Sequence, residues 1–337
     1  MLSKDKSLVS RRSLLAGSMA VAAALASGTG SAAGSQRKQA RTKRRIGEQA
    51  AEQTPTLWTC SMHPQIRLPK PGKCPLCSMD LIPMVTQGRV PIGLQLYSVR
   101  KECERDLPGV VAAVSKMGYK GVEFAGYYNR SANELRKMLD DNGLVCCGTH
   151  TGLDTLLGDN LAGTIEFNKT IGNKYLIVPG LPGKYTGSHQ AWLDTAKLFN
   201  EIAEKVKPHG MLVGYHNHSV EFKVMDGELP WDTFYGNTKK EVVMQIDVGN
   251  AIIGGVDPLP YLYKYPDRAI TVHVKEHSKA DPKALIGEGD VNWKAFFALC
   301  NAVGSTEWFI VEYESDAYPP LESVERCLKN LRRLKLV

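Results

Sequence analysis

Val242-Val-Met-Gln-Ile-Asp247 is a short apolar run whose alternate positions differ in chemical character. Successive side chains of a strand point to opposite faces, so Gln245 and Asp247 are expected on the face opposite to the apolar residues. The runs 269–274 and 308–313 repeat the pattern. The outward residues are then predicted to be Val242, Met244, Ile246, Ile270, Val272, Val274, Phe309 and Val311, and the inward ones include Thr271, His273, Lys275 and Glu312.

Eight short apolar runs of this kind alternate with amphipathic, helix-like segments between residues 90 and 337. The predicted strands are 91–97, 120–124, 144–149, 174–178, 211–216, 242–247, 269–274 and 308–313, and predicted helices include 131–142, 188–207, 292–302 and 320–335. Eight strand–helix repeats in about 250 residues predict an α/β fold, a (β/α)₈ TIM barrel. An open doubly wound sheet is disfavoured because no glycine-rich phosphate fingerprint follows the first strand.

Polar residues gather at the carboxyl ends of the predicted strands, where the active site of such a barrel lies. They are Gln95, Glu123, His150, His216, His218, Asp247, His273, Lys275 and Glu312. Carboxylates that face one another in a barrel mouth repel, and a divalent cation relieves this repulsion. Mixed histidine and carboxylate ligation suits a cation such as Mn, Co, Zn or Mg.

The first 55 residues are expected to be an export signal followed by a linker. Ser10-Arg11-Arg12 precedes a short apolar stretch, and the pattern resembles a twin-arginine signal peptide over residues 1–33. The stretch is too short to span a bilayer. Residues 34–55 read as a disordered linker. Residues 1–47 carry ten Lys/Arg and one Asp, so the remainder is nearly neutral and nucleic-acid binding is not expected.

Residues 56–86 are predicted to form a small Cys-rich metal-binding module. Cys60-Ser-Met62-His63 is followed by Cys74-Pro-Leu-Cys77. Thiolate and thioether are soft donors that suit copper, silver or zinc. So short a unit cannot be stable through a hydrophobic core alone and needs a bound metal or a disulfide. A Cys74–Cys77 disulfide is the alternative. The stretch resembles the heavy-metal-binding domain of copper efflux proteins, which implies Cys60, Cys74 and Cys77 as ligands, with His63 or Met62 and Met79 nearby.

The barrel region carries a second resemblance. Gly93-Leu-Gln-Leu-Tyr-Ser, Tyr215-His-Asn-His, Ile246-Asp-Val-Gly-Asn, Val272-His-Val-Lys-Glu, Gly287-Glu-Gly-Asp-Val-Asn-Trp and Val311-Glu-Tyr-Glu are similar to motifs of the sugar phosphate isomerase/epimerase superfamily, the xylose isomerase-like barrels. The resemblance implies Asp247, His273 and Glu312 as metal ligands. The family's strand-five ligand is usually a Glu, and here His216 holds that position, with Glu221 as the alternative fourth ligand.

The same resemblance places further residues around the substrate. His150 and Lys275 would lie beside it as acid or electrophile, and Glu312 with His216 or Glu221 would supply the acid/base pair. Gln95, Glu123, His218 and Glu288 would line the pocket.

The expected chemistry is proton abstraction next to a carbonyl, with the cation stabilising an enediolate. This predicts an exported, periplasmic isomerase or epimerase of a non-phosphorylated sugar or keto-sugar, which meets the twin-arginine translocase during export. The alternative is a 3-keto-glycoside lyase or dehydratase, in which the same enediolate expels a leaving group from the neighbouring carbon. Two further readings stay open, an endonuclease IV-like phosphodiesterase and a non-enzymatic periplasmic protein that handles heavy metals.

Overall fold

The computed structural model describes residues 57–60, 63–68, 70–84 and 90–337. The predicted signal peptide and linker, residues 1–33 and 34–55, lie outside the described residues, as does Met62. No helix in the described ranges is long and apolar enough to cross a membrane.

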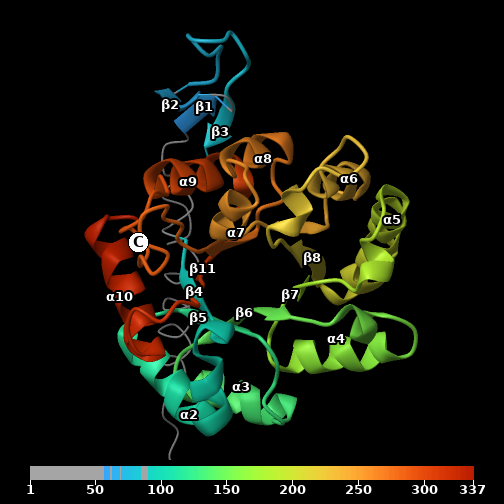
Figure 1. Cartoon of the computed structure of the whole chain (residues 1–337), viewed down its shortest axis with the longest axis vertical. Helices are drawn as coiled ribbons and strands as arrows, with labels where there is room; N and C mark the ends of the chain where they lie inside the picture. The colour runs from blue at the N-terminus through green and yellow to red at the C-terminus, as the bar shows by residue number, and fades with distance from the viewer. Residues whose placement is uncertain (1–56, 61–62, 69, 85–89) are drawn as a thin grey trace, which may run out of the picture. The chain divides into compact units, whose positions relative to one another are not determined.

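The larger part is a parallel eight-stranded barrel surrounded by helices (Figure 1). The strand order is β10-β11-β4-β5-β6-β7-β8-β9, and a backbone bridge between Asp247 and His273 joins the two ends of this series. The TIM barrel predicted from the sequence is therefore confirmed. The strands are β4 (Ile92–Gln95), β5 (Gly121–Phe124), β6 (Val145–His150), β7 (Tyr175–Val178), β8 (Leu212–His216), β9 (Val243–Gln245), β10 (Thr271–Val274) and β11 (Trp308–Val311).

Helices follow the strands and cover the barrel from outside (Figure 1). They are α2 (Arg100–Met117), α3 (Ala132–Asp141), α4 (Asn160–Thr170), α5 (His189–Val206), α6 (Pro230–Asn237), α7 (Val248–Ile253), α8 (Leu259–Lys264), α9 (Trp293–Leu299) and α10 (Pro320–Arg333). A capping box of Ser131 and Glu134 begins α3. Short 3₁₀ turns η1 (Leu96–Val99), η2 (Leu153–Leu156), η3 (Gly183–Tyr185), η4 (Lys207–His209) and η5 (Val220–Phe222), and a π turn η6 (Cys300–Gly304), complete the fold.

Three strands, β4, β9 and β11, end two residues earlier than predicted, and after two of them a side chain caps the turn or helix that follows. Gln95 accepts a hydrogen bond from the backbone N–H of Tyr97 and begins η1, so β4 stops there rather than at residue 97. Asp247 caps α7 by accepting from the N–H of Asn250, so β9 ends at Gln245. In both cases a side chain that faces the barrel mouth also fixes the backbone that follows it.

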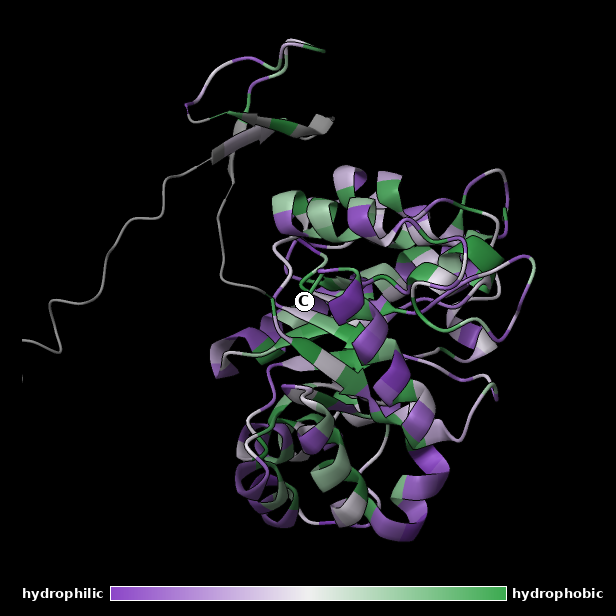
Figure 2. Ribbon diagram, turned by 90° about the vertical axis from the view of Figure 1, so that its left-hand side faces the viewer, coloured by the Kyte–Doolittle hydropathy of each residue, from purple (hydrophilic) through white to green (hydrophobic). Residues whose placement is uncertain are grey.

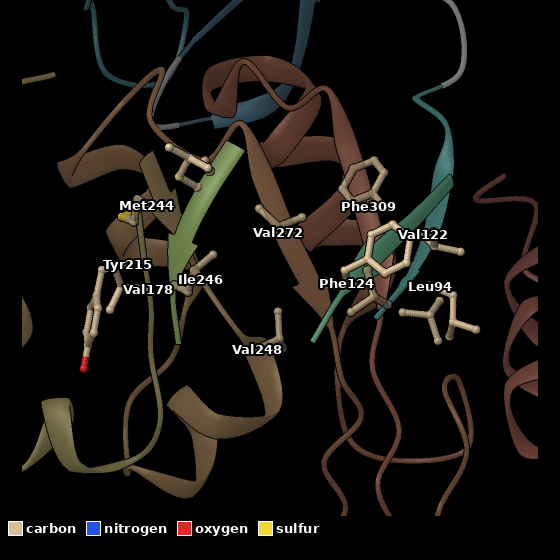
Figure 3. Packing of buried hydrophobic residues seen from close by; sticks show 14 of the residues in the cluster. Leu94, Val122, Phe124, Val178, Tyr215, Met244, Ile246, Val248, Val272 and Phe309 are labelled. Carbon is tan, nitrogen blue, oxygen red and sulfur yellow. The ribbon is translucent and has the colours of Figure 1, made fainter. Parts of the chain in front are cut away.

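The main core lies between the strands and the helices. Met244, Ile246, Val272 and Phe309 are buried there with residues of neighbouring strands (Figure 3), as the alternation predicts. Figure 2 shows the central strands as largely hydrophobic. The exception is Ile270, predicted to face outward: it precedes β10 and packs against a separate cluster that includes Tyr175, Ile177 and Val243.

The smaller part is a three-stranded antiparallel sheet in the order β2-β1-β3. Its strands are β1 (Leu57–Cys60), β2 (His63–Leu68) and β3 (Ile82–Met84). Cys60, Cys74 and Leu81 are buried together, with Trp58, Ile66 and Cys77 packed against them. So few apolar side chains form only a small core, which agrees with a unit that needs a bound metal or a disulfide for its stability.

Candidate active site and metal centre

Four side chains from the last four strands of the barrel converge at its carboxyl end. His216 ends β8, Asp247 follows β9, His273 lies on β10 and Glu312 follows β11. Each offers one ligand atom, these atoms lie within 4.8 Å of one another, and all four residues are buried. The structure thus brings together the four residues that the sequence and the resemblance single out.

The polar atoms of this group fit a bound cation. His216 Nδ1 and Asp247 Oδ2 are buried without a hydrogen-bond partner, a costly arrangement unless another group satisfies them. His273 Nδ1 also lies 2.7 Å from Glu312 Oε2. Two imidazoles and two carboxylates form a donor set that divalent transition metals accept. The barrel can therefore hold a metal ion at this point.

The charges of the group are strongly coupled. Burial, together with the nearby Glu312, raises the pKa of Asp247 to about 7, against the opposing effect of Lys275. Burial alone would lower the pKa of His273, but Glu123 and Glu312 outweigh it and raise that pKa to about 10. The pKa of Glu312 is held well below its usual range, because Lys275 and His273 outweigh its burial. Without a cation, His273 carries the positive charge that the carboxylates require.

Glu123 lies beneath the group and is completely buried. Its carboxylate is 2.6 Å from His273 Nε2 and accepts hydrogen bonds from Gln95 Nε2 at 2.7 Å and Gln245 Nε2 at 2.8 Å. A carboxylate on one ring nitrogen fixes the tautomer and turns the other nitrogen toward a metal. Gln95 and Glu123 were predicted to line the substrate pocket, and the structure places Glu123 against His273 and Gln95 against Glu123.

Asp247 is held by two asparagines. Its Oδ1 accepts from the N–H of Asn250 at 2.6 Å, and its own N–H donates to Asn217 Oδ1 at 2.8 Å. Asn250 Nδ2 donates to the carbonyl of Asn217 at 3.1 Å, which ties the two loops together. These contacts leave Oδ2 directed at the other three ligand candidates without a partner.

Lys275 stands above the group between two carboxylates. Its Nζ is 3.1 Å from Glu312 Oε1 and also contacts Glu314. Although burial opposes it, the neighbouring Asp247, Glu312 and Glu314 raise the pKa of Lys275 above its usual value. Lys275 is therefore a fixed cation at the edge of the site.

A cavity of about 380 Å³ opens over the group. Its lining includes His150, His216, His218, Lys275 and Glu312. Burial lowers the pKa of His150, against the opposing effect of Glu123, and its Nε2 lies 3.1 Å from Gln245 Oε1. Strands β6 and β10 lie on opposite sides of the ring, so His150 and Lys275 face the cavity from opposite walls.

Two further predicted site residues, Glu221 and Glu288, belong neither to the lining of this cavity nor to the group of ligand candidates. Glu221 is buried, and its oxygens accept from the Tyr215 hydroxyl at 2.6 Å and the His218 N–H at 2.8 Å. It shapes the loop after β8 and is not among the ligand candidates. Glu288 is exposed and accepts from Asn330 on α10 at 3.0 Å and from the Leu285 N–H at 3.2 Å. His216, rather than Glu221, is the fourth member of the group of ligand candidates.

Sequence reasoning assigned no role to three residues of the site. Asn217 and Asn250 hold Asp247, and Tyr97 lines the cavity. An Asx cap directly after a strand could have indicated Asn250, because Asp247-Val-Gly-Asn250 has the spacing of a side chain that caps the third following N–H. Nothing in the sequence alone points Tyr97 toward the cavity.

The small part contains the second group of ligand candidates, Cys60, Cys74 and Cys77. The Sγ atoms of Cys60 and Cys77 are 3.4 Å apart, and Leu76 N–H donates to Cys74 Sγ. Burial opposes ionisation of Cys74, but the N–H groups of Leu76 and Cys77 and the thiols of Cys60 and Cys77 lower its pKa to about 6. Three converging thiols suit a soft cation. The side chain of His63 lies outside the described part of the chain.

Two family models match the chain. Residues 111–334 match the xylose isomerase-like TIM barrel, and residues 57–84 match the heavy metal binding domain. The two resemblances read from the sequence motifs are therefore both confirmed at the level of the family.

Individual proteins extend the comparison. An inosose dehydratase of Clostridium perfringens is 23% identical over 262 residues, which cover 66% of this chain and 88% of that protein. A sugar phosphate isomerase/epimerase structure from Parabacteroides distasonis is similar with a TM-score of 0.65 and 26% identity, covering 73% of this chain and 99% of the other. The IOLI protein, whose structure contains a zinc atom, shares the fold with a TM-score of 0.57 and 13% identity over 73% and 98% of the two chains.

Proposed function

Because the chain belongs to the xylose isomerase-like TIM barrel family, we propose that it is a divalent-metal-dependent isomerase or epimerase of a sugar or keto-sugar. The observation that carries this proposal is the convergence of His216, Asp247, His273 and Glu312, whose ligand atoms lie within 4.8 Å of one another below a cavity. Such a group has a high desolvation cost and little structural use without a cation.

A divalent cation bound there would polarise a carbonyl oxygen and stabilise the negative charge of an enediolate. The residues of the chain would do the remaining work. Glu312 Oε1 faces Lys275 rather than the other ligand candidates, so it would take the proton from the carbon next to the carbonyl. Lys275 would hold the developing charge on the substrate hydroxyl, and His150 on the opposite wall would carry the proton at the second carbon. His218 would bind a hydroxyl at the rim.

A lyase or dehydratase is the second candidate, and the inosose dehydratase relatives favour it. Loss of a leaving group next to the enediolate needs the same base and the same cation. It differs only in which group the acid on the far wall protonates. His150 would then protonate a departing oxygen instead of a carbon.

We further propose that the protein is exported through the twin-arginine translocase and works in the periplasm, which rests on the pattern around Arg11 and Arg12. A small carbohydrate is the proposed partner of the barrel, and a soft cation such as copper, zinc or silver that of the Cys60, Cys74 and Cys77 group.

Proton exchange tests the enzymatic proposal before the natural substrate is identified. The manganese-loaded protein is incubated in D₂O with a panel of ketoses and 3-keto-sugars, and deuterium incorporation next to the carbonyl is followed by NMR. We expect exchange that chelation abolishes and that Asp247→Ala and His273→Ala both lack. Full exchange in these variants, or none in the loaded wild-type protein while copper or silver still binds the thiols, would favour a metal-handling protein without sugar chemistry.

A further inference from the structure

A second cavity, of about 570 Å³, opens beside the one over the metal group. The two cavities share His150, which ends β6. The second is bounded by the loop that follows β6, by α4 and by Tyr127, and Figure 1 shows α4 next to β6 and β7. A ligand bound over the metal group can therefore extend past His150 from the first cavity into the second.

A third cavity, of about 660 Å³, prolongs the second one. The second and third cavities share Gly152, Asp159 and Asn160, so together they extend toward the loop after β7. A pocket that binds one small ligand measures roughly 300–1,000 Å³. The first cavity alone falls within that range, which makes the added length unnecessary for a single sugar ring.

The chemistry of the second cavity is that of a site for a neutral ring. The rings of Tyr127 and Phe167 lie with centroids 4.2 Å apart and are half-buried in its wall. Thr155, Asn160 and Thr164 add hydroxyl and amide groups. A sugar or aryl ring offers an apolar face to the aromatic pair, and a sugar adds hydroxyls for the polar groups.

The charge of this hollow disfavours a phosphate. Asp159 is the one charged residue among the described residues that line the second cavity. In the third cavity Lys184 is accompanied by Asp154 and Asp159. Asp159, at the N-terminus of α4, and Asp154 would repel a phosphate, and Lys184 is the one lysine or arginine among the described residues that line the two cavities.

We propose that the second cavity is a subsite for an uncharged second ring, so that the substrate is a glycoside of at least two rings rather than a free or phosphorylated monosaccharide. This proposal rests on the proposed sugar chemistry of the barrel. It assigns the reacting ring to the cavity over the metal group and the second ring to the space between His150 and the Tyr127–Phe167 pair.

Gly163 on α4 allows a precise test. It lines the second cavity, and a Cβ atom added to it would meet nothing within 4 Å. Gly163→Leu would therefore place an apolar side chain at the wall of the cavity without a clash at its Cβ, and leucine also favours the helix by up to about 1 kcal/mol over glycine. Ala162→Leu is the matched control, because Ala162 is exposed on the same helix and does not line the cavity.

The probes are D-glucose with one ring, and cellobiose, maltose and 4-nitrophenyl β-D-glucoside with two, titrated calorimetrically into the manganese-loaded full chain. We expect at least one two-ring probe to bind about tenfold more tightly than glucose, the factor that roughly 1.4 kcal/mol of contact energy produces. Gly163→Leu should remove this advantage and Ala162→Leu should keep it.

Equal binding of one-ring and two-ring probes, no binding of any probe, or an advantage that survives Gly163→Leu would overturn the subsite. The proton-exchange experiment separates this failure from failure of the proposed function. Exchange without a preference for two-ring probes would refute the subsite alone. Absence of exchange would refute the proposed sugar chemistry, on which the subsite depends.

Discussion

Asp247 and His273 are joined by an isolated parallel backbone bridge at the point where β9 and β10 close the barrel. The His273 N–H donates to the carbonyl of Ile246 at 2.9 Å, directly before Asp247. The two strand ends that complete the ring thus carry two of the four ligand candidates. A cation bound by their side chains would hold together the same seam that the backbone bridge closes.

Metal loading is therefore expected to stabilise the barrel. Saturation at about 100 times Kd adds roughly 2.7 kcal/mol to the free energy of unfolding. Manganese is the suitable probe because thiols bind it weakly. Thermal melts should show a higher Tm for the manganese-loaded wild-type protein than for the chelated protein. Asp247→Ala should show no such difference, and an equal shift in this variant would contradict the assignment.

Glu123→Gln tests the role of the buried carboxylate beneath His273. The amide keeps the shape of the side chain but no longer favours an N–H at His273 Nε2. We expect metal affinity to fall by about 10- to 100-fold, as for other partners of metal-binding histidines. Competition with a fluorescent chelator measures it, and circular dichroism checks the fold. Unchanged affinity would show that Glu123 does not orient His273.

The identity of the fourth ligand is tested by a pair of variants. His216→Ala removes a ligand candidate, whereas Glu221→Gln changes a carboxylate that is engaged with Tyr215 and the His218 N–H. Metal analysis should find strongly reduced manganese in His216→Ala and normal manganese in Glu221→Gln. The opposite pattern would place Glu221 at the metal.

Metal affinity should rise with pH. The cation needs the lone pair of His273 Nδ1, and in the metal-free protein this histidine has a pKa raised to about 10. Binding below that pH therefore expels a proton. Below about pH 7 the raised pKa of Asp247 adds a second proton and steepens the dependence. Affinity should thus increase by about tenfold per pH unit between roughly pH 7 and 8.5. A flat profile from titrations in several buffers would refute this coupling.

Two glycines predict opposite effects on stability. A Cβ added to Gly214 on β8 would lie 2.7 Å from both the carbonyl oxygen and the Cβ of Val243, inside the barrel wall. Gly214→Ala should cost about 1–3 kcal/mol through overpacking. Gly163→Ala, which adds its Cβ to open space on a helix, should instead gain up to about 1 kcal/mol. Urea unfolding curves measure both, and destabilisation of similar size in the two variants would contradict the packing described for the barrel.

The barrel and its ligand group were predictable because both follow from local patterns. Alternation along each strand decides which side chains face inward, and parallel strands bring their carboxyl ends to one rim. That reasoning brings His216, Asp247, His273 and Glu312 to the same rim with other polar residues, and the family resemblance then selects Asp247, His273 and Glu312 as metal ligands.

The roles of the carboxylates around the group could not be read in this way. Gln95 and Glu123 face inward as predicted, but their depth in the barrel decides that Glu123 contacts His273 and that Gln95 contacts Glu123. Glu221 and Glu288 lie in loops, where no periodicity fixes the direction of a side chain. Ile270 differs for a related reason: it precedes the strand, so the alternation does not yet apply to it.

Anomalous diffraction from crystals of the zinc-loaded protein tests the central claim most directly. The account predicts a zinc peak in the barrel with bonds of about 2.0–2.2 Å to one atom each of His216, Asp247, His273 and Glu312. A barrel without a peak at saturating zinc, or a peak that lacks Asp247 and His273 among its ligands, would contradict it.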